Sequence, residues 1–154
     1  MLKGAARLLF AFEGRTGRAG FWLGLAAVLA AALAVTLAVV RAFGATGEPT
    51  PGLVLLSFLL YFMLLWPLTA LGAKRFHDRG RPGWLSVVAL GPPYLLTVAD
   101  ALKLSETGEG ATWLASALSW AALLAVLWAV VELGFMPGDP DPNRFGPPPG
   151  RAVQ

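Results

Sequence analysis

Four long stretches of the chain contain no Asp, Glu, Lys, Arg or His, and they constrain the fold more than any other feature. They cover residues 19–40, 49–73, 82–99 and 110–131. About 20 apolar residues in a helix cross a hydrocarbon core of about 30 Å, so the first, second and fourth stretches have the length of a transmembrane helix. The third reaches that length by including residues 100–102. With 56% hydrophobic and 14% charged residues, the chain is too apolar for a soluble globular protein.

These stretches predict an all-α integral membrane protein with a bundle of four transmembrane helices. We expect a membrane domain over residues 1–135, with spans at about 19–41, 49–73, 82–102 and 110–132. Prolines at positions 67, 92 and 93 are expected to kink or break two of these helices.

The two ends of the chain lie outside the spans. Lys3 and Arg7 are four residues apart and apolar residues occupy another face, which predicts a short N-terminal amphipathic helix at the membrane interface. Residues 136–154 are rich in proline and predict a tail without regular helix, extended or disordered.

Lysine and arginine are distributed unequally between the connections. Ten of the 12 precede the first stretch, separate the second from the third, or lie in the tail, and only Arg41 and Lys103 fall in the other two connections. Basic residues accumulate on the cytoplasmic side of membrane proteins. The N-terminus, the central connection and the C-terminus are therefore expected to be cytoplasmic.

Three polar segments combine arginine, glycine and aromatic residues. They are FEGRTGRAGFW at 12–22, KRFHDRGRPGW at 74–84 and PNRFG at 142–146. In order and placement they resemble a bacterial family called domain of unknown function 805, the YhaH-like proteins, whose members combine GR-x-x-R-x-x-FW, RR-x-HD-x-G-x-SGW and a late NR-[FY]-G. Lys74 and Pro82 stand here where Arg and Ser are usual. The resemblance implies a small multi-pass protein of the bacterial inner (plasma) membrane, and it brings no established activity.

The arginines of these segments are the main candidates for binding, because guanidinium groups hold phosphate and carboxylate through paired hydrogen bonds. The predicted anion-binding residues are Arg15, Arg18, Arg75, Arg79, Arg81, Asn143 and Arg144. This interpretation predicts a non-enzymatic module whose basic cytoplasmic face binds anionic lipid or a partner protein. In a second interpretation the arginines pair internally, with Asp78, Glu13 and Glu132 as counter-charges, and join the helix ends.

His77 next to Asp78 suggests an alternative function, a membrane-embedded enzyme acting on a phosphate-bearing lipid or small molecule. Adjacent helical residues point about 100° apart, so the two side chains need not touch. No second catalytic carboxylate or nucleophile stands at a fixed spacing, and His77 and Asp78 are the only catalytic candidates.

The absence of cysteine and the single histidine exclude a thiolate zinc site, an iron–sulfur cluster and a cysteine nucleophile, and we expect neither a metal nor a cofactor. The basic charge would also suit nucleic acid, but no base-reading motif accompanies it. The expected partners are anionic membrane lipids, with a homo-oligomer or a larger membrane protein as further alternatives.

Overall fold

The structure is a computed structural model that describes residues 2–43, 51–101 and 109–150. Its elements are α1 (Leu2–Phe10), α2 (Arg18–Phe43), α3 (Pro51–His77), α4 (Leu85–Ala101), α5 (Glu109–Ala129) and the π-helix η1 (Val130–Phe135). No strand is present in these three ranges, where the predicted all-α class is confirmed.

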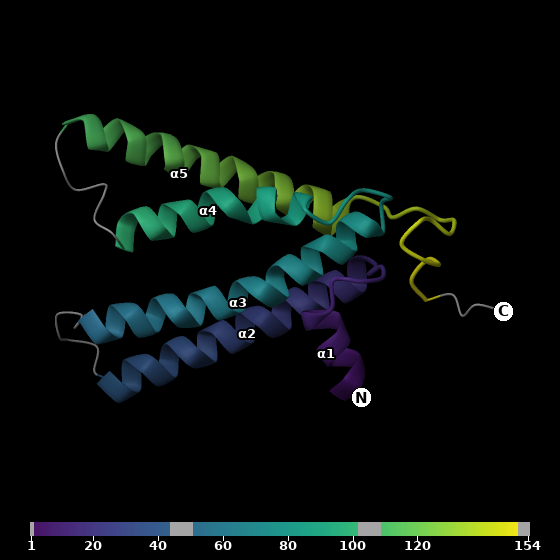
Figure 1. Ribbon diagram of the computed structural model, residues 1–154, viewed down its shortest axis with the longest axis horizontal. Coiled ribbons are helices and arrows are strands. Elements are labelled where there is room, and N and C mark those ends of the chain that lie inside the picture. Colours follow the sequence, from purple (N-terminus) through teal and green to yellow (C-terminus); the bar gives the residue numbers. More distant parts are fainter. Residues whose placement is uncertain (1, 44–50, 102–108, 151–154) are drawn as a thin grey trace.

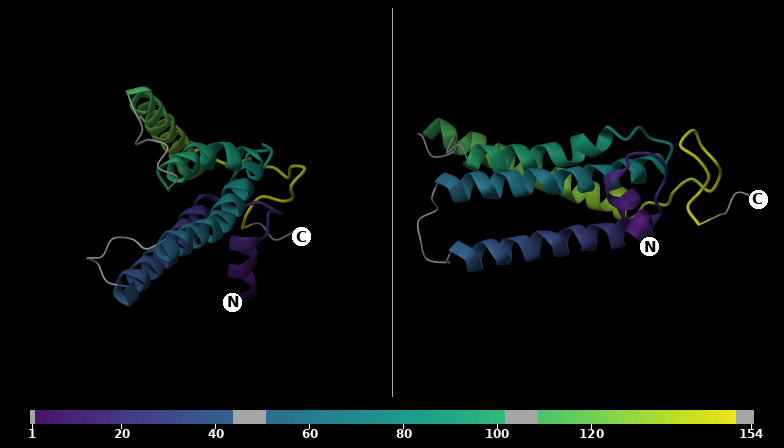
Figure 2. Two further views of the ribbon diagram at one scale, coloured as in Figure 1. Left: turned by 60° about the vertical axis from the view of Figure 1, so that its left-hand side comes forward. Right: turned by 60° about the horizontal axis from the view of Figure 1, so that its bottom comes forward.

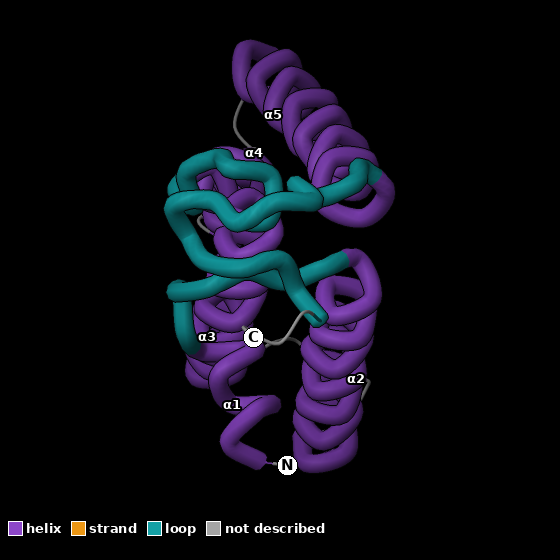
Figure 3. Tube along the Cα trace, turned by 90° about the vertical axis from the view of Figure 1, so that its right-hand side faces the viewer, coloured by secondary structure: helices purple, strands orange, loops and turns teal. Residues whose placement is uncertain are grey.

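The long helices form two hairpins that diverge from a shared end. Figure 1 and Figure 2 show α2 beside α3 and α4 beside α5. The hairpins are joined where α3 contacts α4 and where η1 contacts both α2 and α3. At this end α1 projects steeply away from the long helices, and the loops and the tail cover the helix ends (Figure 1, Figure 3). We call it the basic end, formed by residues 11–17, 74–84 and 130–150.

The core of the molecule lies at the basic end rather than halfway along the helices. Phe21, Leu71, Phe76 and Leu133 form a buried cluster drawn from α2, α3 and η1. The last two turns of α3 are almost completely buried, with no exposure at Leu71, Arg75 and Phe76. The other elements therefore pack around the last two turns of α3.

Away from the basic end the helices expose large apolar side chains. Leu33 is 61% exposed and Met63 is 70% exposed. Two helical segments, Arg18–Arg41 and Ala115–Phe135, are long and apolar enough to cross a membrane, and only 11% and 22% of their apolar windows are buried. The core helix of a soluble protein would be mostly buried, so the low burial of these two segments suggests an association with a membrane.

Helix boundaries differ from the predicted spans at the basic end. We expected the second span to end at 73, but α3 continues to His77 and carries Lys74 and Arg75 in its last turn. Cations are favourable there because helix dipoles are negative at their C-termini. The helix ends before a turn in which Gly80 has φ 67°, a conformation that favours glycine.

The other boundaries shift for local reasons. We expected the third span to begin at 82, but α4 begins at Leu85, and Ser86 Oγ donates to the Gly83 carbonyl in the preceding turn. The fourth was expected to end at 132, but α5 passes into η1 and helical structure continues to Phe135.

The prolines that were expected to kink or break two helices do not break them, because α3 and α4 continue through these positions. Pro67 is buried, and Pro93 lines a cavity between the helices. Backbone carbonyls freed by proline are tolerated in such surroundings when neighbouring elements cover them.

Candidate functional site

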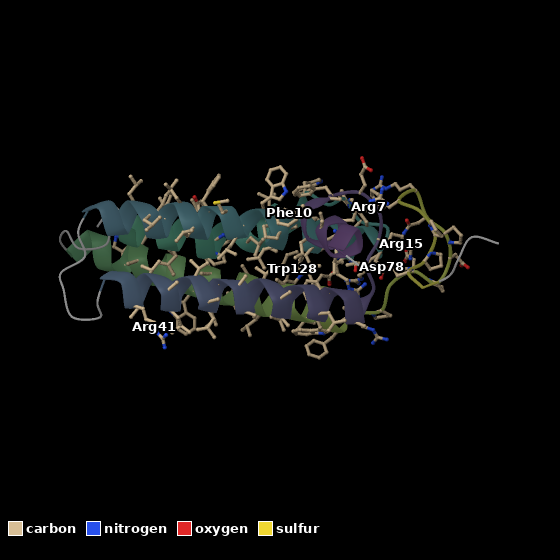
Figure 4. The ribbon with its side chains drawn as sticks, turned by 90° about the horizontal axis from the view of Figure 1, so that it is seen from below. Arg7, Phe10, Arg15, Arg41, Asp78 and Trp128 are labelled. Atoms are coloured by element: carbon tan, nitrogen blue, oxygen red, sulfur yellow. The ribbon has the colours of Figure 1, made fainter. Side chains whose placement is uncertain are left out.

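The basic end brings together the three polar segments that the sequence singled out. Figure 4 shows Arg15 and Asp78 side by side at this end, while Arg41 lies toward the opposite end of α2. Arg15 comes from the segment before α2, Asp78 follows α3, and the tail runs across both. The seven predicted anion-binding residues all belong to these segments, but their surroundings differ.

Asp78 is the centre of the first group of ion pairs. Its carboxylate is 4% exposed, and it accepts from Arg15 Nε at 3.1 Å and from Arg75 Nη1 at 2.6 Å. The Arg15 side chain is 1% exposed and that of Arg75 is fully buried. Two buried cations share one buried carboxylate, so one positive charge is in excess and needs other oxygen atoms around it.

Main-chain carbonyls supply those oxygen atoms. Arg15 makes five hydrogen bonds, and besides the Asp78 carboxylate it donates to the carbonyls of Asp78, Asp139, Asp141 and Gly146 at 2.6–3.3 Å. A guanidinium has five N–H donors, so these bonds use the whole group. Arg15 therefore fastens the tail to the end of α3.

Arg75 fastens η1 in the same way. Its Nε donates to the Leu133 carbonyl at 2.7 Å, and its Nη2 donates to the Met136 carbonyl. A π-helix leaves carbonyls out of the ordinary helical pattern, and a buried arginine satisfies them here.

The tail residues that match the NRFG segment complete this contact. Asn143 Nδ2 donates to the His77 carbonyl at 2.9 Å and to Asp139 Oδ2 at 3.1 Å, while its Oδ1 accepts from Phe145 N at 3.0 Å. Asn143 and Gly146 also exchange two backbone hydrogen bonds. Residues 136–150 of the tail contain no regular helix and lie against the end of the bundle, while residues 151–154 lie outside the described range.

Gly138 passes against the Asp78 carboxylate with no room for a side chain. A Cβ atom at this position would overlap Asp78 Oδ2, while the next amide, Asp139 N, donates to the Asp78 carbonyl at 2.7 Å. The close passage of the tail over Asp78 therefore requires glycine here.

Glu132 is the centre of the second group of ion pairs. This buried glutamate of η1 pairs through Oε1 with both Arg79 and Arg81. The Arg79 side chain is 17% exposed and that of Arg81 is 47% exposed, so the second group is open to solvent on one side. Again two arginines share one acid, and the region keeps an excess of positive charge.

Lys74 has a different partner, the C-terminus of α1. Its Nζ donates to the Arg7 carbonyl at 2.8 Å and to the Leu8 carbonyl. Burial lowers the pKa of Lys74 to about 8, so the amine is still mostly a cation at neutral pH. A cation at these otherwise unpaired carbonyls holds α1 against α3.

His77 is directed to the tail and not to Asp78. Its ring stacks on Phe145 with the centroids 3.8 Å apart, and its Nδ1 lies 3.1 Å from the Gly14 carbonyl, which it can reach only as a donor. Burial lowers the pKa of His77, the hydrogen bond to Gly14 opposes this, and the charge of Arg144 adds to the lowering. The hydrogen bonds of the described residues do not link His77 with Asp78, so the geometry provides no dyad for acid–base chemistry.

The predicted anion-binding residues therefore fall into two sets. The side-chain N–H groups of Arg15, Arg75 and Asn143 donate hydrogen bonds to other groups of the protein. Arg18, Arg81 and Arg144 are exposed, although Arg81 also pairs with Glu132 and Arg144 also donates to the Gly80 carbonyl at 3.4 Å. Arg79 lies between the two sets. The predicted counter-charges Asp78 and Glu132 are in ion pairs, whereas Glu13 is exposed and takes part in none of those found in the described ranges. These ranges also bring no three His, Asp or Glu side chains together for a metal ion.

Two functional details were missed from the sequence. Lys74 was assigned to a basic loop, although a lysine in the last turn of a helix is a recognisable partner for helix carbonyls. The requirement for glycine at position 138 cannot be recognised in the sequence, because it arises only where the folded tail passes over the Asp78 carboxylate.

Comparisons with known proteins agree with the motifs. Residues 9–147 match the family described as "Protein of unknown function (DUF805)". The chain is 30% identical over 153 residues to the "Uncharacterized protein YiiR" of Escherichia coli strain K12, with 90% of this chain and 85% of the relative covered, and it has the same similarity to the YiiR protein of strain O157:H7. No solved structure matches. The chain therefore belongs to the DUF805 family.

Proposed function

We propose that all four long helices cross the bacterial inner membrane, with the basic end on the cytoplasmic side. α3 has 27 residues and α4 has 17, lengths of about 40 Å and 25 Å at 1.5 Å per residue. The proposal is supported by the shared position of the segment before α2, the turn after α3 and the tail, because basic segments gather on the cytoplasmic side. In this placement α1 lies in the interface, with Phe10 exposed.

The function that the geometry supports best is a non-enzymatic membrane module that retains anionic lipid through its basic end. The observation that carries this proposal is the sharing of the Asp78 and Glu132 carboxylates by two arginines each; one of these four arginines, Arg81, is exposed, and so are Arg18 and Arg144 near them. Internal pairing leaves positive charge uncompensated, and each basic residue at a headgroup surface contributes about 1 kcal/mol to binding anionic lipid. An acidic segment of a partner protein would use the same arginines.

Native mass spectrometry from nanodiscs tests this proposal. The nanodiscs contain phosphatidylglycerol and phosphatidylcholine in equal amounts, and the wild type is compared with Arg81→Gln combined with Arg144→Gln. We expect the wild type to retain phosphatidylglycerol preferentially and the double variant to lose about 30-fold in retention, since two residues at about 1 kcal/mol each are removed.

Arg41→Gln is the control, because Arg41 is exposed toward the opposite end of α2. It should leave retention unchanged. Equal retention of the two lipids by the wild type would overturn lipid recognition. A protein subunit that is retained by the wild type and lost in the double variant would assign the basic end to a protein partner.

A further inference from the structure

An apolar cavity lies between the two hairpins, next to the basic end. Its volume is about 250 Å³, and α2, α3, α4 and the α5–η1 segment all contribute to its lining. A second cavity of about 240 Å³ lies farther from the basic end. Leu29, Leu68 and Leu90 line both cavities, so the two adjoin along the bundle, and we call them together the apolar passage.

The passage is open on the side between α2 and α5. Trp22, Leu29, Val126 and Val130 line it, and all four are exposed. Within the described ranges α2 meets the second hairpin through η1 and not through α5, which leaves the two helices apart along their length. In the proposed membrane placement this opening faces lipid, and hydrocarbon fits an apolar space that offers water few hydrogen-bond partners.

An exposed arginine, Arg18, lies where this opening meets the basic end. Arg18 is the first residue of α2 and lies one helical turn from Trp22, on the same side of the helix. It is exposed and has no carboxylate partner among the described residues. Trp22 Nε1 donates to the Gly134 carbonyl at 3.2 Å, which holds α2 and η1 together at the head of the opening.

We propose that this passage binds one acyl chain of an anionic phospholipid of the cytoplasmic leaflet, with the phosphate of that lipid held by Arg18. The inference rests on the proposed function and gives it a defined site. Charge argues for lipid and against a second copy of this chain, because a parallel neighbour would place its own basic end against Arg18. A lipid instead supplies hydrocarbon for the passage and a negative charge for the guanidinium.

Photo-crosslinking of the full chain in nanodiscs tests the site. The probe is phosphatidylglycerol with a diazirine in one acyl chain, and labelled peptides are mapped by mass spectrometry. We expect labelling to concentrate on residues 21–29 of α2 and 126–133 of α5–η1. Arg18→Gln should lower it about fivefold, the factor for one basic residue at a headgroup surface, and Arg41→Gln should not.

A second pair of variants tests the passage itself. Leu29→Trp places a large ring where the two cavities join, and Leu29 is 57% exposed, so the helix tolerates the change. Leu33→Trp is the matched control, one turn farther along α2 and 61% exposed. Labelling should fall to the level of the outer face of α2 in Leu29→Trp and stay at the wild-type level in Leu33→Trp.

The outcomes separate this inference from the proposed function. Even labelling of all exposed helix faces, unchanged in Leu29→Trp, would overturn the site, while preferential retention of phosphatidylglycerol would still support the basic end. Equal labelling by a phosphatidylcholine probe, unchanged in Arg18→Gln, would overturn anion recognition by Arg18. Absence of labelling together with a dimer in native mass spectrometry would overturn the lipid and assign the opening to a second copy.

Discussion

Asp78 links two of the buried arginines of the basic end. Its carboxylate pairs with Arg15 and Arg75, and these arginines bind the tail and η1. Asp78→Asn keeps the size of the side chain but leaves two buried guanidinium groups without a carboxylate. Breaking a buried pair in this way costs about 3–5 kcal/mol, and we expect that loss in the free energy of unfolding in detergent micelles.

Glu13→Gln is the matched control for this substitution, because Glu13 is an exposed acid of the neighbouring segment. Its unfolding free energy should stay within about 0.5 kcal/mol of the wild type. A similar small effect of Asp78→Asn would show that the carbonyls alone stabilise Arg15 and Arg75.

His77 makes the stability depend on pH. Burial holds its pKa below the ordinary 6.5, so the unfolded chain binds more protons than the folded one as the pH falls below 6.5. The folded state then loses stability between pH 6.5 and the lowered pKa. We expect a lower melting temperature at about pH 5.5 than at about pH 7.5.

His77→Gln removes the titration, and because His77 is the single histidine no other imidazole masks the result. The variant should melt at nearly the same temperature at both pH values. A wild type that is more stable at the lower pH would mean that protonated His77 gains a partner in the folded state, which contradicts the assigned environment.

At the scale of residues, the sequence predicted which side chains come together at the basic end better than it predicted what each of them binds. Arginine, asparagine and acid side chains in three motifs were enough to predict that these segments act together. The pairing of Asp78 with Arg15, 63 residues earlier, depends on how the hairpins meet, and local spacing holds no information about that. For the same reason the sequence left internal pairing and ligand binding as alternatives.

At the scale of elements, α1 depends on Lys74. Replacing Lys74 with methionine keeps the length of the side chain but leaves the carbonyls of Arg7 and Leu8 without their donor. One hydrogen bond from a charged group contributes about 1.5–3 kcal/mol, so we expect amide hydrogen exchange in α1 to rise by about tenfold or more.

Arg7→Gln controls for loss of a charge near the same helix, because the Arg7 side chain is exposed and only its carbonyl meets Lys74. Exchange in α1 should be unchanged in this variant. If Lys74→Met were also unchanged, the apolar contact of Leu8 with the core and the bond from Trp66 Nε1 to the Phe10 carbonyl would be sufficient to dock α1.

Helix existence was predictable from the apolar stretches, but helix ends were not. Apolar length marks where a chain can cross hydrocarbon, and α3 continues past that limit because its last turn is buried by other parts of the protein. A stripe of alanines at 26, 27, 30, 31 and 34 looks suited to helix packing, yet it faces outward, and α2 packs on α3 near Gly24 and Leu71 instead. Residue size alone does not show which face meets a neighbour.

At the scale of the whole molecule, the buried ion pairs lie at one end of the bundle and the exposed apolar surface lies along the helices. Ion pairs and tail contacts close the basic end, while the apolar passage remains open between the hairpins. Attachment at one end with an opening along the helices is the arrangement that the proposed retention of lipid between the hairpins needs. The divergence of the hairpins depends on contacts among α3, α4 and η1, so charge and hydropathy along the sequence do not predict it.

The orientation of the bundle is the prediction on which the cytoplasmic assignment of the basic end depends. A reporter that is active only in the periplasm should be active when fused after residue 45 or 106, positions outside the described residues. The same reporter should be inactive after residue 78 or at the C-terminus, because the turn after α3 and the tail lie together at the basic end. The opposite pattern would place that end in the periplasm, and activity after only one of residues 45 and 106 would reduce the number of spans below four.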